Sequence, residues 1–174
     1  FALVYNTTRK STLKFLYGSA FRAPNVEEVY SSSDHINLIP NPDLASEYIY
    51  TPEGIWEHEW SRGLVSTISL YDYRMRGLIE LSANDEVAAM QYQNTGKANA
   101  KGIELGISAR TGSTRIYSSA AFQRARDGAS DVVLWSSPAF LGKAGASFSA
   151  GSLFRAGVQL RGETGRMTAR NPYT

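Results

Sequence analysis

The chain has 174 residues, of which 43% are hydrophobic and 20% charged, so it is neither intrinsically disordered nor fibrous. Its 18 Lys and Arg against 16 Asp and Glu leave a net charge of +2, which gives no reason to expect nucleic acid as a partner. The absence of cysteine excludes disulfide scaffolds and thiolate metal sites, and no run approaches the roughly 18 apolar residues of a membrane-spanning helix. Phe1 already lies inside a strand-like pattern, so we expect a section of something longer.

Alternation of apolar and polar residues predicts β-strands along the chain. Aromatic residues make up 11% of the sequence and glycines number 15, a mix that favours strands and tight turns. The clearest segment is 154–163, in which Phe154, Val158 and Leu160 alternate with polar residues. In chain order, the expected strands cover 13–21, 48–60, 64–80, 102–110, 140–148 and 154–163, and the chain has room for about eight. Only 64–80 is strand-like in composition without a clean apolar face.

One apolar and one polar face on each strand fit two architectures. A soluble sandwich would bury its apolar faces, whereas a membrane barrel turns them to lipid and its polar faces to a wet lumen. Alternation alone does not choose between these two. The expected strands, at about 10–14 residues, exceed the usual ~5–6, and with a tilt of ~45° they climb roughly 25–30 Å. Strand length therefore favours an all-β, antiparallel transmembrane β-barrel.

The connections between the expected strands alternate between short and long. Short turns are expected at 6–10, 61–63, 111–113 and 151–152, and longer connections at 23–45, 81–89 and 127–138. Short periplasmic turns and long extracellular loops are typical of outer-membrane barrels. The strand number fits either a small closed barrel of about eight strands or an incomplete section of a larger one.

Several motifs resemble those of TonB-dependent outer-membrane receptors in order and spacing. The first two are Phe21-Arg22-Ala23-Pro24 and Asn41-Pro42-Asp43-Leu44, with Glu47 matching the glutamate that follows in the family. Tyr92-Gln93-Asn94 and Gly102-Ile103-Glu104-Leu105 resemble later family motifs. Ala45-Ser46 departs from the pattern, since family members usually have Lys-Pro there. The resemblance implies that residues 1–174 are part of a barrel of roughly 22 strands, with the plug domain and the final strands absent from this chain.

The resemblance also implies a function. It predicts a receptor in the bacterial outer membrane, held in the lipid bilayer, which captures a scarce small molecule at its extracellular loops. Its own plug domain and TonB, both outside this chain, would then drive uptake. A ferric siderophore is the leading cargo, and no resident cofactor is expected. The motifs of nucleotide-binding, serine-hydrolase and metalloprotease sites are missing, so we do not expect an enzyme, and a passive outer-membrane pore stays open as an alternative.

Candidate ligand contacts lie between the first two motifs. His35 stands beside Asp34 in the long connection, and Tyr30 follows the first motif. In haem receptors of the family, a histidine between these motifs binds the haem iron. A neutral imidazole suits this task because one nitrogen ligates iron while a carboxylate holds the other. The alternative is a solvated loop histidine after the serine-rich segment 31–33, and both interpretations stay open.

Two further predictions concern the strand faces. Charged side chains are expected to line a wet lumen: Glu47, Glu53, Glu57, Glu59, Glu104, Arg110, Arg155 and Arg161. Aromatic residues are expected to form girdles at the membrane interfaces: Tyr48, Tyr50, Trp56, Trp60, Tyr71 and Tyr73. His58 falls on the face opposite Glu57 and Glu59, so these three residues do not predict a metal site.

Overall fold

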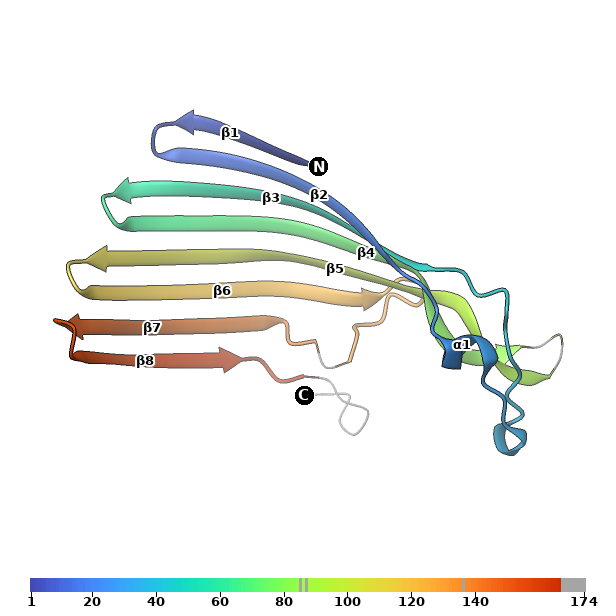
Figure 1. Cartoon of the computed structure of the whole chain (residues 1–174). Coiled ribbons are helices and arrows are strands. Elements are labelled where there is room, and N and C mark those ends of the chain that lie inside the picture. The colour runs from blue at the N-terminus through green and yellow to red at the C-terminus, as the bar shows by residue number, and fades with distance from the viewer. Residues whose placement is uncertain (85, 87, 136, 167–174) are drawn as a thin grey trace.

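A computed structural model shows a single antiparallel sheet whose strands follow one another in sequence order (Figure 1). It describes residues 1–84, 86, 88–135 and 137–166, without the side chain of His35. The strands are β1 (Ala2–Thr8), β2 (Ser11–Arg22), β3 (Glu47–Ser61), β4 (Leu64–Asn84), β5 (Ala89–Thr111), β6 (Thr114–Asp127), β7 (Phe140–Ala150) and β8 (Phe154–Glu163). A short helix, α1 (Val26–Tyr30), and a 3-10 turn, η1 (Asp34–Ile36), lie between β2 and β3.

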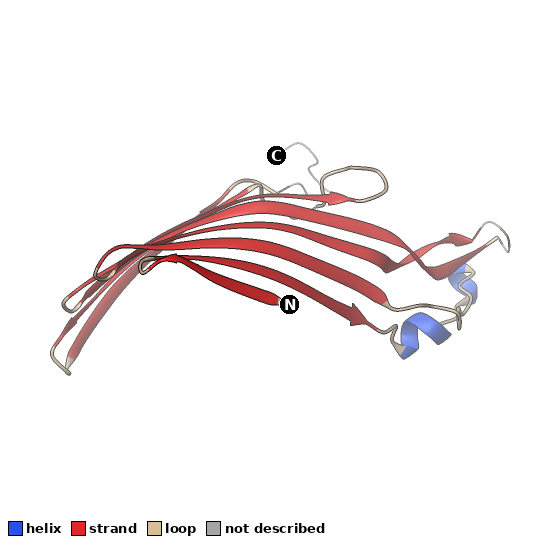
Figure 2. Ribbon diagram, turned by 90° about the horizontal axis from the view of Figure 1, so that it is seen from above, coloured by secondary structure: helices blue, strands red, loops and turns tan. Residues whose placement is uncertain are grey.

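The sheet is open at both sides. Within the described residues, β1 pairs with β2 alone and β8 with β7 alone, and Figure 2 shows the sheet as a curved trough. The prediction of about eight antiparallel strands is therefore confirmed. A small closed barrel of eight strands, one of the alternatives, is not what these residues form.

The register of the strands aligns apolar residues with apolar residues on one face of the sheet and polar residues with polar residues on the other. Across the sheet, Leu13 lies opposite Trp56, which lies opposite Ile68, and the row continues through Leu105 to Ala120. The neighbouring row, one residue along each strand, joins Thr12, Glu57, Thr67, Gly106 and Ser119. Because side chains alternate across a strand, the first row marks an apolar face and the second a polar face.

No second layer covers the apolar face in the part of the chain that the structure describes. Leu105, Ile107, Val158 and Leu160 are 37%, 49%, 64% and 69% exposed, and no described side chain of large volume is fully buried. A soluble sandwich would bury these four residues in a dry interior. Their exposure on one sheet is the arrangement that a lipid-facing barrel wall requires.

The hairpin of β4 and β5 is much longer than a bilayer needs. These strands have 21 and 23 residues, whereas about 9–11 tilted residues cross the apolar layer. On the apolar face of β5, Ile107, Leu105 and Ile103 give way to Lys101 and Asn99 toward the tip. The upper half of the hairpin therefore stands above the membrane.

The connections fall at two ends, as predicted. The four short turns lie at one end of the strands, and the longer β2–β3 and β6–β7 connections lie at the other (Figure 1). The prediction of a longer connection at 81–89 is wrong. Strands β4 and β5 remain paired there, from Glu80 opposite Gln93 to Asn84 opposite Ala89. Neither helical segment in the described part of the chain has the length and apolar character to cross a membrane.

Candidate functional site

The end of the sheet that carries the long connections is held by one arginine. Arg22, the last residue of β2, forms a two-bond pair with Glu28 of α1, from Nη1 and Nη2 at 3.0 and 2.9 Å. Its Nε and Nη2 also donate to Glu47, the first residue of β3, at 2.6 and 2.7 Å. A planar guanidinium suits this double pairing, since its donors form a rigid fork. We call Arg22, Glu28 and Glu47 the arginine clasp.

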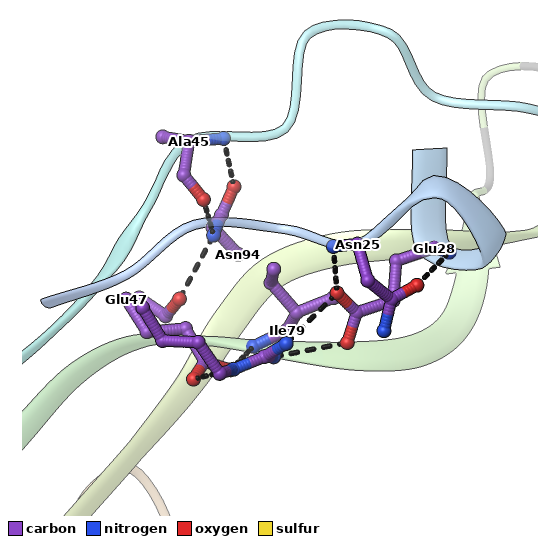
Figure 3. Close-up of polar contacts among 8 residues, drawn as sticks. Asn25, Glu28, Ala45, Glu47, Ile79 and Asn94 are labelled. Carbon is purple, nitrogen blue, oxygen red and sulfur yellow. Dashed lines mark hydrogen bonds and ion pairs between the residues drawn. The ribbon is translucent and has the colours of Figure 1, made fainter. Parts of the chain in front are cut away.

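The clasp extends to both of its neighbours. Glu47 Oε1 accepts a bond from the Ile79 backbone N–H of β4 at 2.8 Å (Figure 3). Glu28 and Asn25 form a capping box, in which Asn25 Oδ1 accepts from the Glu28 N–H at 2.9 Å and Glu28 Oε2 accepts from the Asn25 N–H at 2.8 Å. The hydrogen bonds from Arg22 hold the pKa of the Glu28 carboxyl below its usual range, because they favour the carboxylate. The family-like motif thus ties α1 to three strands.

The β2–β3 connection lies along β5 like an added strand. Leu38 forms a parallel bridge with Met90, and the Ile39 N–H donates to the Met90 carbonyl at 3.0 Å. Asn41 Nδ2 donates to the Tyr92 carbonyl at 2.8 Å. Side chains also fasten the loop on either side of this bridge: Asn37 to Ala88, and Gln91 to Pro40. The connection and the tall β4–β5 hairpin therefore form one connected unit.

Asn94 of β5 fastens the far end of the same connection. Its Nδ2 donates to the Ala45 and Gly77 carbonyls, and its Oδ1 accepts from the Ala45 N–H, all at 2.8 Å (Figure 3). Gly77 has φ +64°, and pairing between β4 and β5 shifts register on both sides of Leu78. A β-bulge at a glycine in this conformation turns the Gly77 carbonyl toward Asn94.

The remaining motif residues have structural positions as well. Asp43 N–H donates to Asn41 Oδ1 at 3.1 Å, so the second motif forms an Asx turn before β3. Phe21 is 70% exposed on the apolar face, with its ring 6.4 Å from that of Tyr48. Other motif residues connect these elements: Ala23 and Pro24 lead from β2 to Asn25, and Pro42 and Leu44 lie within and after the turn.

A polar network crosses the polar face below the clasp. Ser69 Oγ donates to Glu53 Oε1 at 2.5 Å, and Lys14 Nζ lies 3.0 Å from Glu57 Oε2. Tyr71 Oη donates to Gln123 Oε1 at 3.3 Å. All the charged residues expected to line a lumen fall in the rows of this face: Glu47, Glu53, Glu57, Glu59, Glu104, Arg110, Arg155 and Arg161.

Gly102 makes the Tyr71 contact possible. Tyr71 lies directly opposite Gly102 in the β4–β5 register, and a Cβ placed on Gly102 would lie 2.5 Å from Tyr71 Oη. The phenol ring therefore lies across β5 to reach β6. This position corrects one prediction: Tyr71 and Tyr73, stacked with ring centroids 4.6 Å apart, belong to the polar face and not to an interfacial girdle. Tyr48, Tyr50, Trp56 and Trp60 do lie in rows of the apolar face.

The predicted ligand contacts are spread along the β2–β3 connection. Tyr30 ends α1 and is 66% exposed, and Asp34 begins η1, where its carbonyl accepts from the Asn37 N–H. His35 lies in the backbone of η1, but its side chain lies outside the described residues. The structure shows no polar contact between Tyr30 and Asp34 among the described atoms. No cluster of three or more metal-binding side chains occurs in the described part of the chain.

Sequence reasoning missed the fastening of the loop to β5. Asn94 was noticed only as part of a motif, and Asn37 and Gln91 had no signal at all, because each acts on a backbone group some fifty residues away. Their partners depend on which strands stand side by side. The signal that the sequence did contain is the lack of a clean alternation within 64–80, the segment that includes the bulge at Gly77.

An open sheet with a lipid-compatible face, a polar face and loops gathered at one end defines a section of a transmembrane β-barrel wall. The TonB dependent receptor-like β-barrel family matches residues 1–173, so the chain belongs to this family, whose members are outer-membrane barrels. The family is one of transport receptors, which agrees with the expectation of a protein that is not an enzyme.

Individual relatives match in sequence or in fold. The vitamin B12 transporter BtuB of Vibrio cholerae serotype O1 is 32% identical over 113 residues, which are 64% of this chain and 17% of BtuB. A variant of the ferric enterobactin receptor PfeA from Pseudomonas aeruginosa, in complex with enterobactin, matches 98% of this chain and 29% of its own, with a TM-score of 0.76 and 18% identity. The siderophore receptor PirA from Acinetobacter baumannii matches 87% of this chain over 26% of its own length, with a TM-score of 0.69 and 16% identity. The chain thus spans less than a third of each relative.

Proposed function

We propose that this chain is part of a receptor that binds a ferric siderophore at its extracellular loops and imports it by TonB-driven transport. The plug domain and TonB would act from outside residues 1–174. Membership of the TonB-dependent receptor family carries the proposal. The connected unit of the β2–β3 connection and the β4–β5 hairpin supports it, since a fixed platform above the membrane positions loops for capture.

Cargo chemistry is the finer part of the proposal. PfeA and PirA are siderophore receptors by name, and BtuB is a vitamin B12 transporter. The siderophore is the first choice because the fold match to PfeA covers nearly the whole chain. Cobalamin is the competing cargo, favoured by the sequence match to BtuB.

Uptake by the full-length receptor tests the proposal. A strain lacking the receptor is complemented and given radioactive ferric siderophores, cobalamin or haem, with and without an uncoupler of the proton gradient. We expect uptake of a ferric siderophore that the uncoupler abolishes. Uptake of cobalamin alone would overturn the cargo assignment, and uptake that persists with the uncoupler would indicate a passive pore.

Haem binding through His35 is a second candidate, because η1 holds residue 35 midway along the extracellular connection. Its test is separate from uptake. The purified receptor is titrated with haem beside a His35→Ala variant and a His58→Ala control, whose side chain accompanies Trp56 and Trp60 on the apolar face. A Soret band that depends on His35 and not on His58 supports axial ligation. Equal spectra in all three proteins would rule it out.

A further inference from the structure

A cationic hollow lies on the apolar face of the sheet, above the lipid-compatible band. Its volume is about 320 Å³, and it is lined by Asn99 and Lys101 of β5, Arg124 and Arg126 of β6, and Asp131 of the β6–β7 connection. The polar face, where a transported molecule would pass, lies on the other side of the same strands. The hollow therefore belongs to the outside of the barrel wall.

The register fixes its height relative to the band. Lys101 lies directly opposite Arg124, and the next pair down on the same face is Ile103 with Phe122. Phe122 in turn lies opposite Phe140, with ring centroids 5.0 Å apart. One step of two residues along a strand is roughly 6.6 Å, so the basic pair borders apolar side chains directly.

The positive charge of the hollow is only partly neutralised. Lys101 is 66% exposed, and its ion pair is with Asp72, at 3.5 Å, a carboxylate that Arg74 also holds at 2.7 Å. Arg126 pairs with Asp131, yet its Nε is buried and has no hydrogen-bond partner among the described atoms. Arg124 is exposed and makes no ion pair within the described residues. In and beside the hollow, four cationic side chains therefore share two carboxylates: Arg74, Lys101, Arg124 and Arg126 against Asp72 and Asp131.

We infer that this hollow binds the phosphate of a phosphorylated lipid headgroup in the outer leaflet of the membrane. The phosphate would accept hydrogen bonds from the exposed side chains of Lys101 and Arg124. The acyl chains would lie along Ile103 and Phe122 immediately below. A basic cluster next to an apolar surface at the membrane boundary is the chemistry that recognises anionic lipid, whereas a water-soluble anion would gain nothing from the apolar part.

Native mass spectrometry of the purified full-length receptor tests the inference. The probe is a diphosphorylated, polyacylated glucosamine lipid, compared with the same lipid after removal of its phosphates and with inorganic phosphate alone. The variant is Lys101→Gln/Arg124→Gln, which leaves the Arg126 contact with Asp131 in place. The matched control is Arg110→Gln/Arg155→Gln, which removes two exposed arginines that line a hollow on the polar face.

We expect the first variant to lose affinity for the phosphorylated lipid by tenfold or more, on the order expected for two basic groups at an anionic surface. The control should bind as the unmodified receptor does, and the dephosphorylated lipid should bind all forms equally weakly. Equal affinity of both variants would overturn the inference. Displacement of the lipid by millimolar inorganic phosphate would also overturn it, because the hollow would then be a site for free phosphate.

Discussion

Replacing Gly102 by alanine is expected to destabilise the barrel wall by about 1–3 kcal/mol, the usual range for overpacking. The new Cβ would lie 2.5 Å from Tyr71 Oη, 2.6 Å from Tyr71 Cζ and 2.7 Å from the Phe122 carbonyl oxygen. The ring must therefore leave its position over β5 and lose its bond to Gln123, worth about 1 kcal/mol at most. Reduced freedom of the unfolded chain offsets ~0.4–1 kcal/mol of this loss.

Gly106→Ala is the matched control. Gly106 lies on the same strand and the same face, but a Cβ there would meet only Thr67, at 3.8 Å, an ordinary contact. We expect this variant to be neutral or more stable by up to ~1 kcal/mol. Unfolding of the full-length receptor by urea in detergent, followed by tryptophan fluorescence, gives both values. If Gly102→Ala unfolds at the same urea concentration as Gly106→Ala, the close packing of Tyr71 over Gly102 is not what shapes this wall.

A second pair of variants separates the two sources of strain. At Gly145 the three atoms nearest to an added Cβ all belong to the Tyr117 side chain, at 2.6–2.8 Å, whereas at Gly102 the third is the Phe122 carbonyl oxygen of the β6 backbone. Tyr117→Ala should therefore remove the whole effect of Gly145→Ala. Tyr71→Ala should remove only part of the effect of Gly102→Ala, because the Phe122 carbonyl stays in place. Complete rescue in both cases would contradict the assigned backbone clash.

Three further predictions concern the loop unit and the sheet edges. Asn94→Ala removes three hydrogen bonds, so amide exchange at Ala45 should accelerate about tenfold or more, and unchanged exchange would contradict the fastening role. The pKa of Glu28 is lowered in the folded protein, so its contribution to docking α1 is present above its unfolded value of about 4.3 and is lost as pH falls through the folded value. A spin label attached to the cysteine of a Val26→Cys variant should therefore keep restricted motion at pH 5–7 and gain mobility only in stronger acid. The same label in a protein that also carries Glu28→Gln should be more mobile across the whole pH range. Residues 1–174 alone should give no stable single-channel conductance in liposomes, because β1 and β8 would leave unpaired edges in lipid.

Much of the sheet could be predicted from the sequence because alternation is strict where strands cross the membrane. The structure has β8 at Phe154–Glu163, the range expected, since each residue there faces either lipid or a polar surface. Expected segments 13–21, 48–60 and 140–148 were each two or three residues shorter in total than the strands that the structure has. Strand ends lie where neither environment imposes alternation, so the pattern fades before the pairing does.

Alternation fails for a physical reason in β4. Below residue 71 its apolar face carries Ile68 and Leu70, but above this point it carries Asp72 and Arg74 because the strand has left the lipid band. The bulge at Gly77 then shifts the register, so residues beyond it no longer follow the earlier parity. Both effects depend on how high the hairpin stands, which the sequence of one strand does not specify.

The motifs single out residues at the end of the sheet that carries the long connections, but they do not specify the contacts of these residues. Arg22 and Glu47 flank one connection, and the structure pairs them. Their shared pairing with Glu28 and with the Ile79 N–H required the bend of the chain through α1. The predictions that involve His35 and a particular cargo stay predictions.

The clasp also constrains where cargo recognition can lie. Both carboxylate oxygens of Glu28 and of Glu47 accept bonds within the protein, and Asn94 uses both ends of its amide. Groups satisfied in this way have little left to offer a ligand, since a new bond would replace one already made. Within this unit, contacts to a ligand would therefore come from side chains that make no such bonds, such as the exposed ring of Tyr30. Under the proposed function, replacing Tyr30 should change cargo preference in the uptake assay while the clasp keeps its geometry.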